Sequence, residues 1–183
     1  EAGVVLRVHP TLVPERSLIA GVNGVSNAVM VNADAVGTTL FYGPGAGAEP
    51  TASSVIADVV DVARLMNSNA DSWVPALGRI SSELKEQTLL NIQDVETGFY
   101  IRFSALDQPG VLSNVTKIMG DAGISIEAII QREQPAGESY VNVIILTNVT
   151  KEKCLDEAVE RIELLDTVRG QVNFIRVEYL DQH

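Results

Sequence analysis

Apolar and polar residues follow two different periods in the second half of the chain. Residues 99–105 carry apolar side chains at every second position, which predicts a strand with one buried face. Residues 111–122 carry apolar side chains at helical spacing, and Gly123 stands where a helix can end in a left-handed conformation. Residues 124–130 alternate again. This part of the chain therefore predicts a strand, a helix and a second strand in succession.

The same two periods return further along the chain. The segment Pro135-Ala136-Gly137 is typical of a hairpin turn and leads into an alternating run over residues 140–146. Helical spacing then covers residues 155–165. Within this helix Glu157 and Arg161 stand four residues apart, and we expect them to pair.

A last strand is expected over residues 172–180, so the order of elements is strand, helix, strand, strand, helix, strand. This order is the split βαβ or ferredoxin-like pattern, in which two helices cover one face of a four-stranded antiparallel sheet. The other face, or one edge, would then be open to a partner.

The first half is less regular and predicts a partial α/β segment with a mixed sheet and helices. Strands are expected at residues 4–8, 28–31 and 38–42, with a turn at residues 34–37. A helix is expected from about Pro50 to Met66, because a proline stands early and threonine or serine can cap it. The apolar side of this helix consists of Val55, Ile56, Val59, Val60 and Ala63.

Residues 67–98 are polar and contain helix-breaking proline and glycine, with a short helical stretch expected at residues 82–90. We therefore expect an α+β protein in three parts. A core segment covers residues 1–66, a linker covers residues 67–98, and a ferredoxin-like domain covers residues 99–183.

Composition narrows the classes of partner. The chain has 183 residues and a formal net charge of −11, and its basic residues form no stripe, which argues against nucleic acid and anionic membranes. The single cysteine excludes an intrachain disulfide and suits a reducing compartment, so we expect a cytoplasmic protein. Because the chain opens at Glu1 without a methionine, we also expect it to be a piece of a longer protein.

The segment Asp107-Gln108-Pro109-Gly110-Val111-Leu112 is the strongest candidate site. A strand that stops at a proline-glycine turn and enters a helix leaves backbone N–H groups free at the helix start, where the dipole favours an anion. The neighbouring Asp107 can hold an ammonium group. A carboxylate site beside an ammonium site is what a free amino acid requires, although a purely structural turn has the same local pattern.

The segment Gly43-Pro44-Gly45-Ala46-Gly47 lies between an expected strand and an expected helix. Glycines let a backbone approach a ligand closely, and a helix start can meet a phosphate. The spacing fits neither the dinucleotide fingerprint nor the P-loop, so spacing alone favours a plain tight turn. His9 has no metal partner and is expected to form a structural hydrogen bond, while Cys154 is expected to be a half-buried core residue.

Longer stretches of the chain resemble homoserine dehydrogenase. The matching stretches are residues 7–14 (Arg-Val-His-Pro-Thr-Leu-Val-Pro), 24–29, 34–37, 41–47 and 50–55. Residues 107–112, Ile124-Ser125-Ile126 and Gln131 resemble the ACT regulatory domain that many members of the family carry at the C-terminus. The resemblance covers nearly the whole chain.

This resemblance implies an NAD(P)-dependent oxidoreductase that interconverts aspartate 4-semialdehyde and homoserine, in threonine and methionine biosynthesis. The catalytic lysine and the residues that hold homoserine would lie upstream of Glu1, so no catalytic residue and no activity are expected in this chain alone. No bound cofactor is expected either, because the nucleotide-binding domain is missing. The residues expected to line the nicotinamide end of the cofactor in the parent enzyme are Gly43, Gly45, Gly47 and Thr51, with Gly45 as the preferred contact.

The resemblance also implies feedback regulation by an amino acid, most plausibly threonine. Gly110, Val111 and Leu112 would offer N–H groups to its carboxylate, and Asp107 or Gln108 would take its ammonium group. Residues near Ile124 of a paired subunit would close the pocket, since a homodimer or higher homo-oligomer is expected. The alternative is a free-standing ACT-type regulatory subunit that senses an amino acid without an enzyme core of its own.

Overall fold

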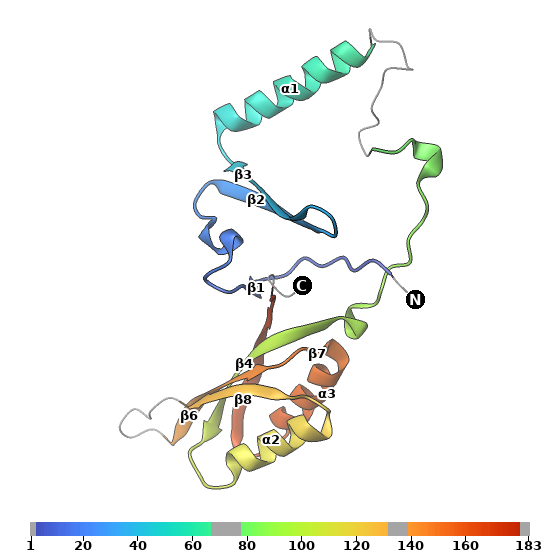
Figure 1. Cartoon of the computed structure of the whole chain (residues 1–183). Coiled ribbons are helices and arrows are strands. Elements are labelled where there is room, and N and C mark those ends of the chain that lie inside the picture. Colours follow the sequence, from blue (N-terminus) through green and yellow to red (C-terminus); the bar gives the residue numbers. More distant parts are fainter. Residues whose placement is uncertain (1–2, 67–77, 132–138, 180–183) are drawn as a thin grey trace. The chain divides into compact units, whose positions relative to one another are not determined.

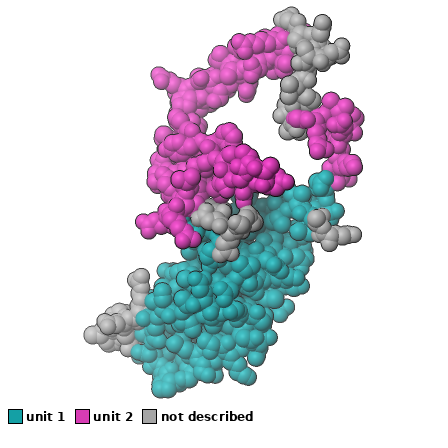
Figure 2. Space-filling view, in the orientation of Figure 1, with its two compact units in different colours: residues 1–14, 87–183 teal, residues 15–86 magenta. Residues whose placement is uncertain are grey.

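The computed structural model describes residues 3–66, 78–131 and 139–179. These residues form two compact units, which Figure 2 colours separately. Unit 1 comprises residues 1–14 and 87–183, and unit 2 comprises residues 15–86. Because the units are defined by contacts alone, the expected domain boundaries at 66/67 and 98/99 stay predictions.

Unit 1 contains the ferredoxin-like domain. Its elements in chain order are β4 (Glu96–Leu106), α2 (Val111–Asp121), β5 (Ile126–Gln131), β6 (Tyr140–Thr147), α3 (Glu152–Glu163) and β8 (Val168–Val177). The four long strands lie in the order β8-β4-β6-β5 and are antiparallel. Figure 1 shows α2 and α3 together against one face of this sheet. The predicted α+β fold with its βαββαβ order is confirmed.

The core of unit 1 lies between the sheet and these two helices. Alternate residues of β4 and β6 point into it, and one side of each helix completes it. The largest side chains that are fully buried there are Phe99, Phe103, Ile101, Met119, Ile145, Leu155 and Ile162. Each contributes roughly 1.5–3 kcal/mol by leaving water. Phe99 also packs edge-on against Phe174 of β8, with ring centroids 5.9 Å apart.

Two further short strands extend the predicted sheet to six. Strand β1 (Thr11–Leu12) pairs in parallel with β8, and β7 (Thr150–Lys151) pairs with β4. The sheet of unit 1 is therefore mixed, and the edge beside β8 is partly covered.

The start of β8 differs from the prediction because of a bulge. The strand begins at Val168, four residues before the expected start, and its register against β4 shifts between Arg102 and Ser104. Gly170 lies inside this bulge with φ +75°, a conformation that breaks the alternation on which the sequence prediction relied.

Three other expectations are wrong, and one falls outside the described residues. Residues 4–8 form no strand but a single bridge from Val4 to Leu89. Residues 82–90 form no helix beyond the end of one 3-10 turn, Ser81–Glu83, and otherwise contribute the bridge residue Leu89. Arg161 pairs across helices with Asp121, at 3.3 Å, where we expected Glu157. The turn expected at residues 135–137 lies outside the described residues.

Unit 2 contains a hairpin and one helix. Strands β2 (Ser26–Ala33) and β3 (Gly37–Pro44) pair antiparallel around the predicted turn, and α1 runs from Ala48 to Met66. None of the side chains of α1 is buried, and its apolar residues Val55 and Ile56 are more than half exposed. Among the described helices, none combines the length and the apolar character that a membrane span requires.

Candidate functional site

The candidate site is the loop between β4 and α2, and hydrogen bonds fix this loop on two sides. Leu106 donates its N–H to the Thr167 carbonyl oxygen at 2.9 Å, and Asp107 donates its N–H to the Ser139 carbonyl oxygen at 3.2 Å. Gly110 has φ +91°, which a residue with a side chain adopts only at a cost. The loop therefore reaches the helix through a turn that needs glycine.

The start of α2 offers donors toward solvent. Asn114 donates to the Gly110 carbonyl oxygen at 3.0 Å, which closes the first turn of the helix, and the Val111 N–H makes a long bond of 3.3 Å to Gln108. Within residues 3–66, 78–131 and 139–179, the N–H groups of Gly110 and Leu112 have no backbone acceptor outside the helix. Unpaired N–H groups at a helix start suit a carboxylate.

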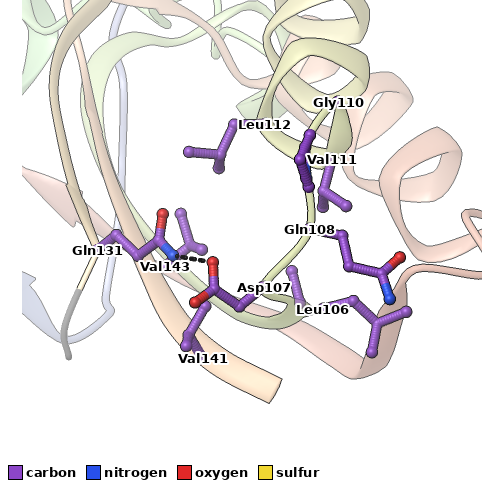
Figure 3. Close-up of a pocket in the computed structure, with 11 residues that line it drawn as sticks. Leu106, Asp107, Gln108, Gly110, Val111, Leu112, Gln131, Val141 and Val143 are labelled. Carbon is purple, nitrogen blue, oxygen red and sulfur yellow. Dashed lines mark hydrogen bonds between the residues drawn. The ribbon is translucent and has the colours of Figure 1, made fainter. Parts of the chain in front are cut away.

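A cavity of about 190 Å³ opens beside this loop. Its lining consists of Ala105, Leu106, Asp107, Gln108, Pro109, Gly110, Val111, Leu112, Gln131, Val141 and Val143. Figure 3 shows Leu112, Val141 and Val143 together on one side of the loop. The walls are mostly apolar, and the polar groups gather at Asp107 and Gln131.

Asp107 and Gln131 meet at this cavity. The Gln131 side-chain Nε2 donates to Oδ1 of Asp107 at 2.9 Å (Figure 3). The bond joins the end of β5 to the site loop and leaves Oδ2 of the carboxylate for another donor. Because Gln131 holds Oδ1, the carboxylate has a fixed orientation, and its open Oδ2 can accept a hydrogen bond from an ammonium group.

Five of the six expected effector residues line the cavity. Asp107, Gln108, Gly110, Val111 and Leu112 do so, although the Gln108 amide points away from the others in Figure 3. Ile124 does not line it: this side chain is 4% exposed and packs in the core of the same chain. Its role at a subunit interface stays a prediction.

Six lining residues were not predicted as site residues: Ala105, Leu106 and Pro109 belong to the loop or to the strand before it, and the other three come from distant parts of the chain. Gln131 ends β5, and Val141 and Val143 lie on β6. Only the register between strands brings them beside the loop. The alternating pattern of β6 indicates that Val141 and Val143 share a face. It does not indicate that this face lies beside the start of α2.

Local structure alone requires two of the three glycines in the loop Gly43–Gly47. A Cβ on Gly45 would stand 1.5 Å from Nδ2 of Asn27, and Gly47 has φ +128°. The Gly45 N–H also donates to the Val25 carbonyl oxygen at 2.9 Å. Gly43, in contrast, has open space where a side chain would stand. Gly43 is therefore the glycine of this loop that nothing within unit 2 requires.

The remaining candidates behave as structural residues. His9 is partly exposed, and its Nδ1 lies 2.9 Å from the Pro10 carbonyl oxygen. Cys154 is partly buried against the core, as expected. In the part of the chain that the structure describes, no three histidine, cysteine or acidic residues gather in a way that could hold a metal ion.

Residues 99–164 match the family model of the ACT domain, so the βαββαβ part of unit 1 is an ACT domain. Residues 1–60 match the family model of homoserine dehydrogenase. The chain is therefore similar to the C-terminal portion of homoserine dehydrogenases, with a homoserine dehydrogenase segment followed by an ACT domain.

Individual relatives agree with this assignment. A homoserine dehydrogenase from Pseudomonas aeruginosa is 49% identical over 99% of this chain and 42% of its own length, and one from Neisseria gonorrhoeae is 44% identical over 97% and 41%. A crystal structure of homoserine dehydrogenase from Thiobacillus denitrificans superposes with a TM-score of 0.87 at 49% identity, over 98% of this chain and 40% of that one. The chain thus spans about two fifths of these relatives.

Proposed function

We propose that this chain is the regulatory end of a homoserine dehydrogenase and that its ACT domain binds a free amino acid at the loop between β4 and α2. The observation that carries the proposal is a single cavity that is lined both by Gly110 and Leu112, whose N–H groups are open, and by Asp107 with its carboxylate. Binding there would regulate the interconversion of aspartate 4-semialdehyde and homoserine by the whole enzyme. We propose threonine as the effector, because it is a product of the pathway to which this reaction belongs.

Each part of the effector has a proposed partner. The α-carboxylate accepts hydrogen bonds from the N–H groups at the start of α2, where the helix dipole adds to their effect. The ammonium group donates to Oδ2 of Asp107, the oxygen that Gln131 leaves open. The threonine methyl group then lies toward the valines of β6, and its hydroxyl toward the polar side at Gln131.

The experiment is a heteronuclear NMR titration of the 183-residue chain with L-threonine and two masked forms. Threonine methyl ester lacks the free carboxylate, and N-acetylthreonine lacks the ammonium group. We expect saturable shifts at residues 107–112 with L-threonine and none with either masked form. Shifts of equal size with a masked form, or none with any free amino acid, would contradict the proposal.

The first part of the chain supports the enzyme over a free-standing sensor subunit, because residues 1–60 match the homoserine dehydrogenase model. In the parent enzyme NAD(P), when bound, would supply or accept the hydride. The open side of Gly43 and the start of α1 fit a place at the edge of that cofactor, with Gly45, Gly47 and Thr51 shaping the loop. Since this chain covers about two fifths of its relatives, we expect it to bind the effector but not to turn over substrate by itself.

We also propose that the parent is a homodimer or higher homo-oligomer. The support is the free edge of the sheet of unit 1, since β5 pairs only with β6 among the described residues and an open edge strand can pair with a second copy. The exposed apolar side of α1, which includes Val59, is assigned instead to the rest of the catalytic core of the parent enzyme.

A further inference from the structure

The sheet of unit 1 has a second face, opposite α2 and α3, and that face has its own hollow. Because side chains alternate along a strand, Arg102 and Ser104 of β4 point away from the core that holds Phe103. The hollow has a volume of about 270 Å³. Its polar lining consists of Arg102, Ser104, Asn142, Arg169, Gln171 and Asn173.

The bulge in β8 brings the two arginines of this lining together. Arg102 lies opposite Asn173, and Ser104 lies opposite Arg169, although the two positions on β8 are four residues apart. Without the extra residues around Gly170, Arg169 would fall beyond the hollow. The Arg169 guanidinium also lies 5.5 Å from the centre of the Tyr140 ring, which limits its freedom.

The charge of the hollow is opposite to that of the chain. Its lining, as far as the structure describes it, contains two arginines and no carboxylate, in a chain whose formal net charge is −11. Other arginines of unit 1 have acidic partners: Arg176 pairs with Glu152, and Arg161 with Asp121. Over the described ranges, Arg102 and Arg169 form no ion pair.

We propose that this hollow binds a small oxyanion, a carboxylate or a phosphate. Guanidinium groups present planar pairs of donors that match the oxygens of both anions. Ser104 and the amides of Asn142 and Asn173 add neutral donors around the two charges. The site is separate from the effector cavity at Asp107, and it stands or falls independently of the proposed function.

The test is an NMR titration of the 183-residue chain at low ionic strength with succinate and, separately, with inorganic phosphate. We expect saturable shifts at Arg102, Ser104 and Asn173 with at least one probe, and the stronger probe identifies the class of anion. Arg102→Gln and Arg169→Gln should each weaken binding at least fivefold. Lys117→Gln, which removes one exposed charge from α2, should leave it unchanged.

Several results would overturn the proposal. These are the absence of saturable shifts with both probes, equal affinity in wild type and Arg102→Gln, or an equal loss in Lys117→Gln. A change of oligomeric state in Arg102→Gln without anion binding would assign the face to protein contact and would also overturn it. If the variants fail to fold, the wild-type chain is modified with phenylglyoxal in the presence and absence of the probe. The probe should protect Arg102 from modification and leave Arg64 of α1 unprotected. Absence of protection at Arg102 contradicts the site.

Discussion

The side-chain amide of Gln131 holds the carboxylate of Asp107 at 2.9 Å, although the two residues lie 24 positions apart in the sequence. This bond ties the end of β5 to the loop that begins the ACT site. It fixes one oxygen of the carboxylate and leaves the other for a ligand. The geometry of the proposed effector site therefore depends on the strand register as well as on the loop.

Removing this tie should weaken effector binding moderately. Gln131→Ala frees the Asp107 carboxylate, which must then be ordered when the ligand binds. A single hydrogen bond contributes about 0.5–1.5 kcal/mol, so we expect an affinity loss of roughly 2- to 12-fold for L-threonine by calorimetry. Gln93→Ala removes an exposed amide that bonds Asp156 instead, and it should leave the affinity unchanged. Equal losses in both variants would contradict the role of Gln131.

Gly110→Asp should weaken L-threonine binding at least tenfold, or about 1.4 kcal/mol, because it places a carboxylate where the ligand's own should lie. Its backbone strain is a separate effect, since φ is +91°. Gly123→Asp adds the same residue at φ +75°, at the far end of α2. That control should lose stability but keep its affinity. Unchanged affinity in a folded Gly110→Asp variant would contradict the site.

Two of the ion pairs that helix residues form, Glu152–Arg176 and Asp121–Arg161, should differ strongly in their contribution to stability. Glu152 and Arg176 are 7% and 17% exposed and are held by two hydrogen bonds, so Glu152→Ala leaves the arginine charge without its partner. We expect a loss of about 3 kcal/mol in urea unfolding. Asp121→Ala breaks the pair with Arg161, whose side chains are about half exposed, and should cost less than about 1 kcal/mol. A smaller loss for Glu152→Ala than for Asp121→Ala would contradict this ranking.

The glycine loop allows a matched comparison of two positions. Gly45→Ala places a Cβ against Nδ2 of the exposed Asn27, whose side chain must rotate away, and should destabilise unit 2 by about 0.5–1.5 kcal/mol. Gly43→Ala meets open space and should change the free energy of unfolding by less than about 0.5 kcal/mol. In the full-length enzyme Gly43→Ala should raise the KM for the cofactor. An unchanged KM would remove Gly43 from the cofactor site.

Tyr179 should give the chain a pH-dependent contribution to stability. Burial raises the pKa of Tyr179 above its usual value of 10.0, and the hydrogen bond and charge of Glu127 raise it further. A raised pKa stabilises the folded state below the pKa of the unfolded chain, and this stabilisation is lost as the pH rises through the folded pKa. Spectrophotometric titration should show one late tyrosine that is missing in Tyr179→Phe. If all tyrosines of the wild-type chain ionise in the ordinary range, with no component at higher pH, the raised pKa of Tyr179 is contradicted.

The sequence predicted the elements of unit 1 well, because apolar periods and turn residues agree there with the final packing. Gly123, for example, has the left-handed conformation that was predicted for it at the end of α2. The bulge at Gly170 and the added strand β1 were not predictable, since they depend on pairing between residues far apart. For the same reason the loop of the site was found from sequence, whereas Gln131 was not.

Calorimetry of L-threonine with the 183-residue chain and its Asp107→Asn variant tests the central claim most directly. We predict one binding site per chain and an affinity at least tenfold lower in the variant, which keeps the shape of Asp107 but loses its charge. Equal affinities in the two proteins, or no binding of L-threonine or any other free amino acid to the folded chain, would contradict the account.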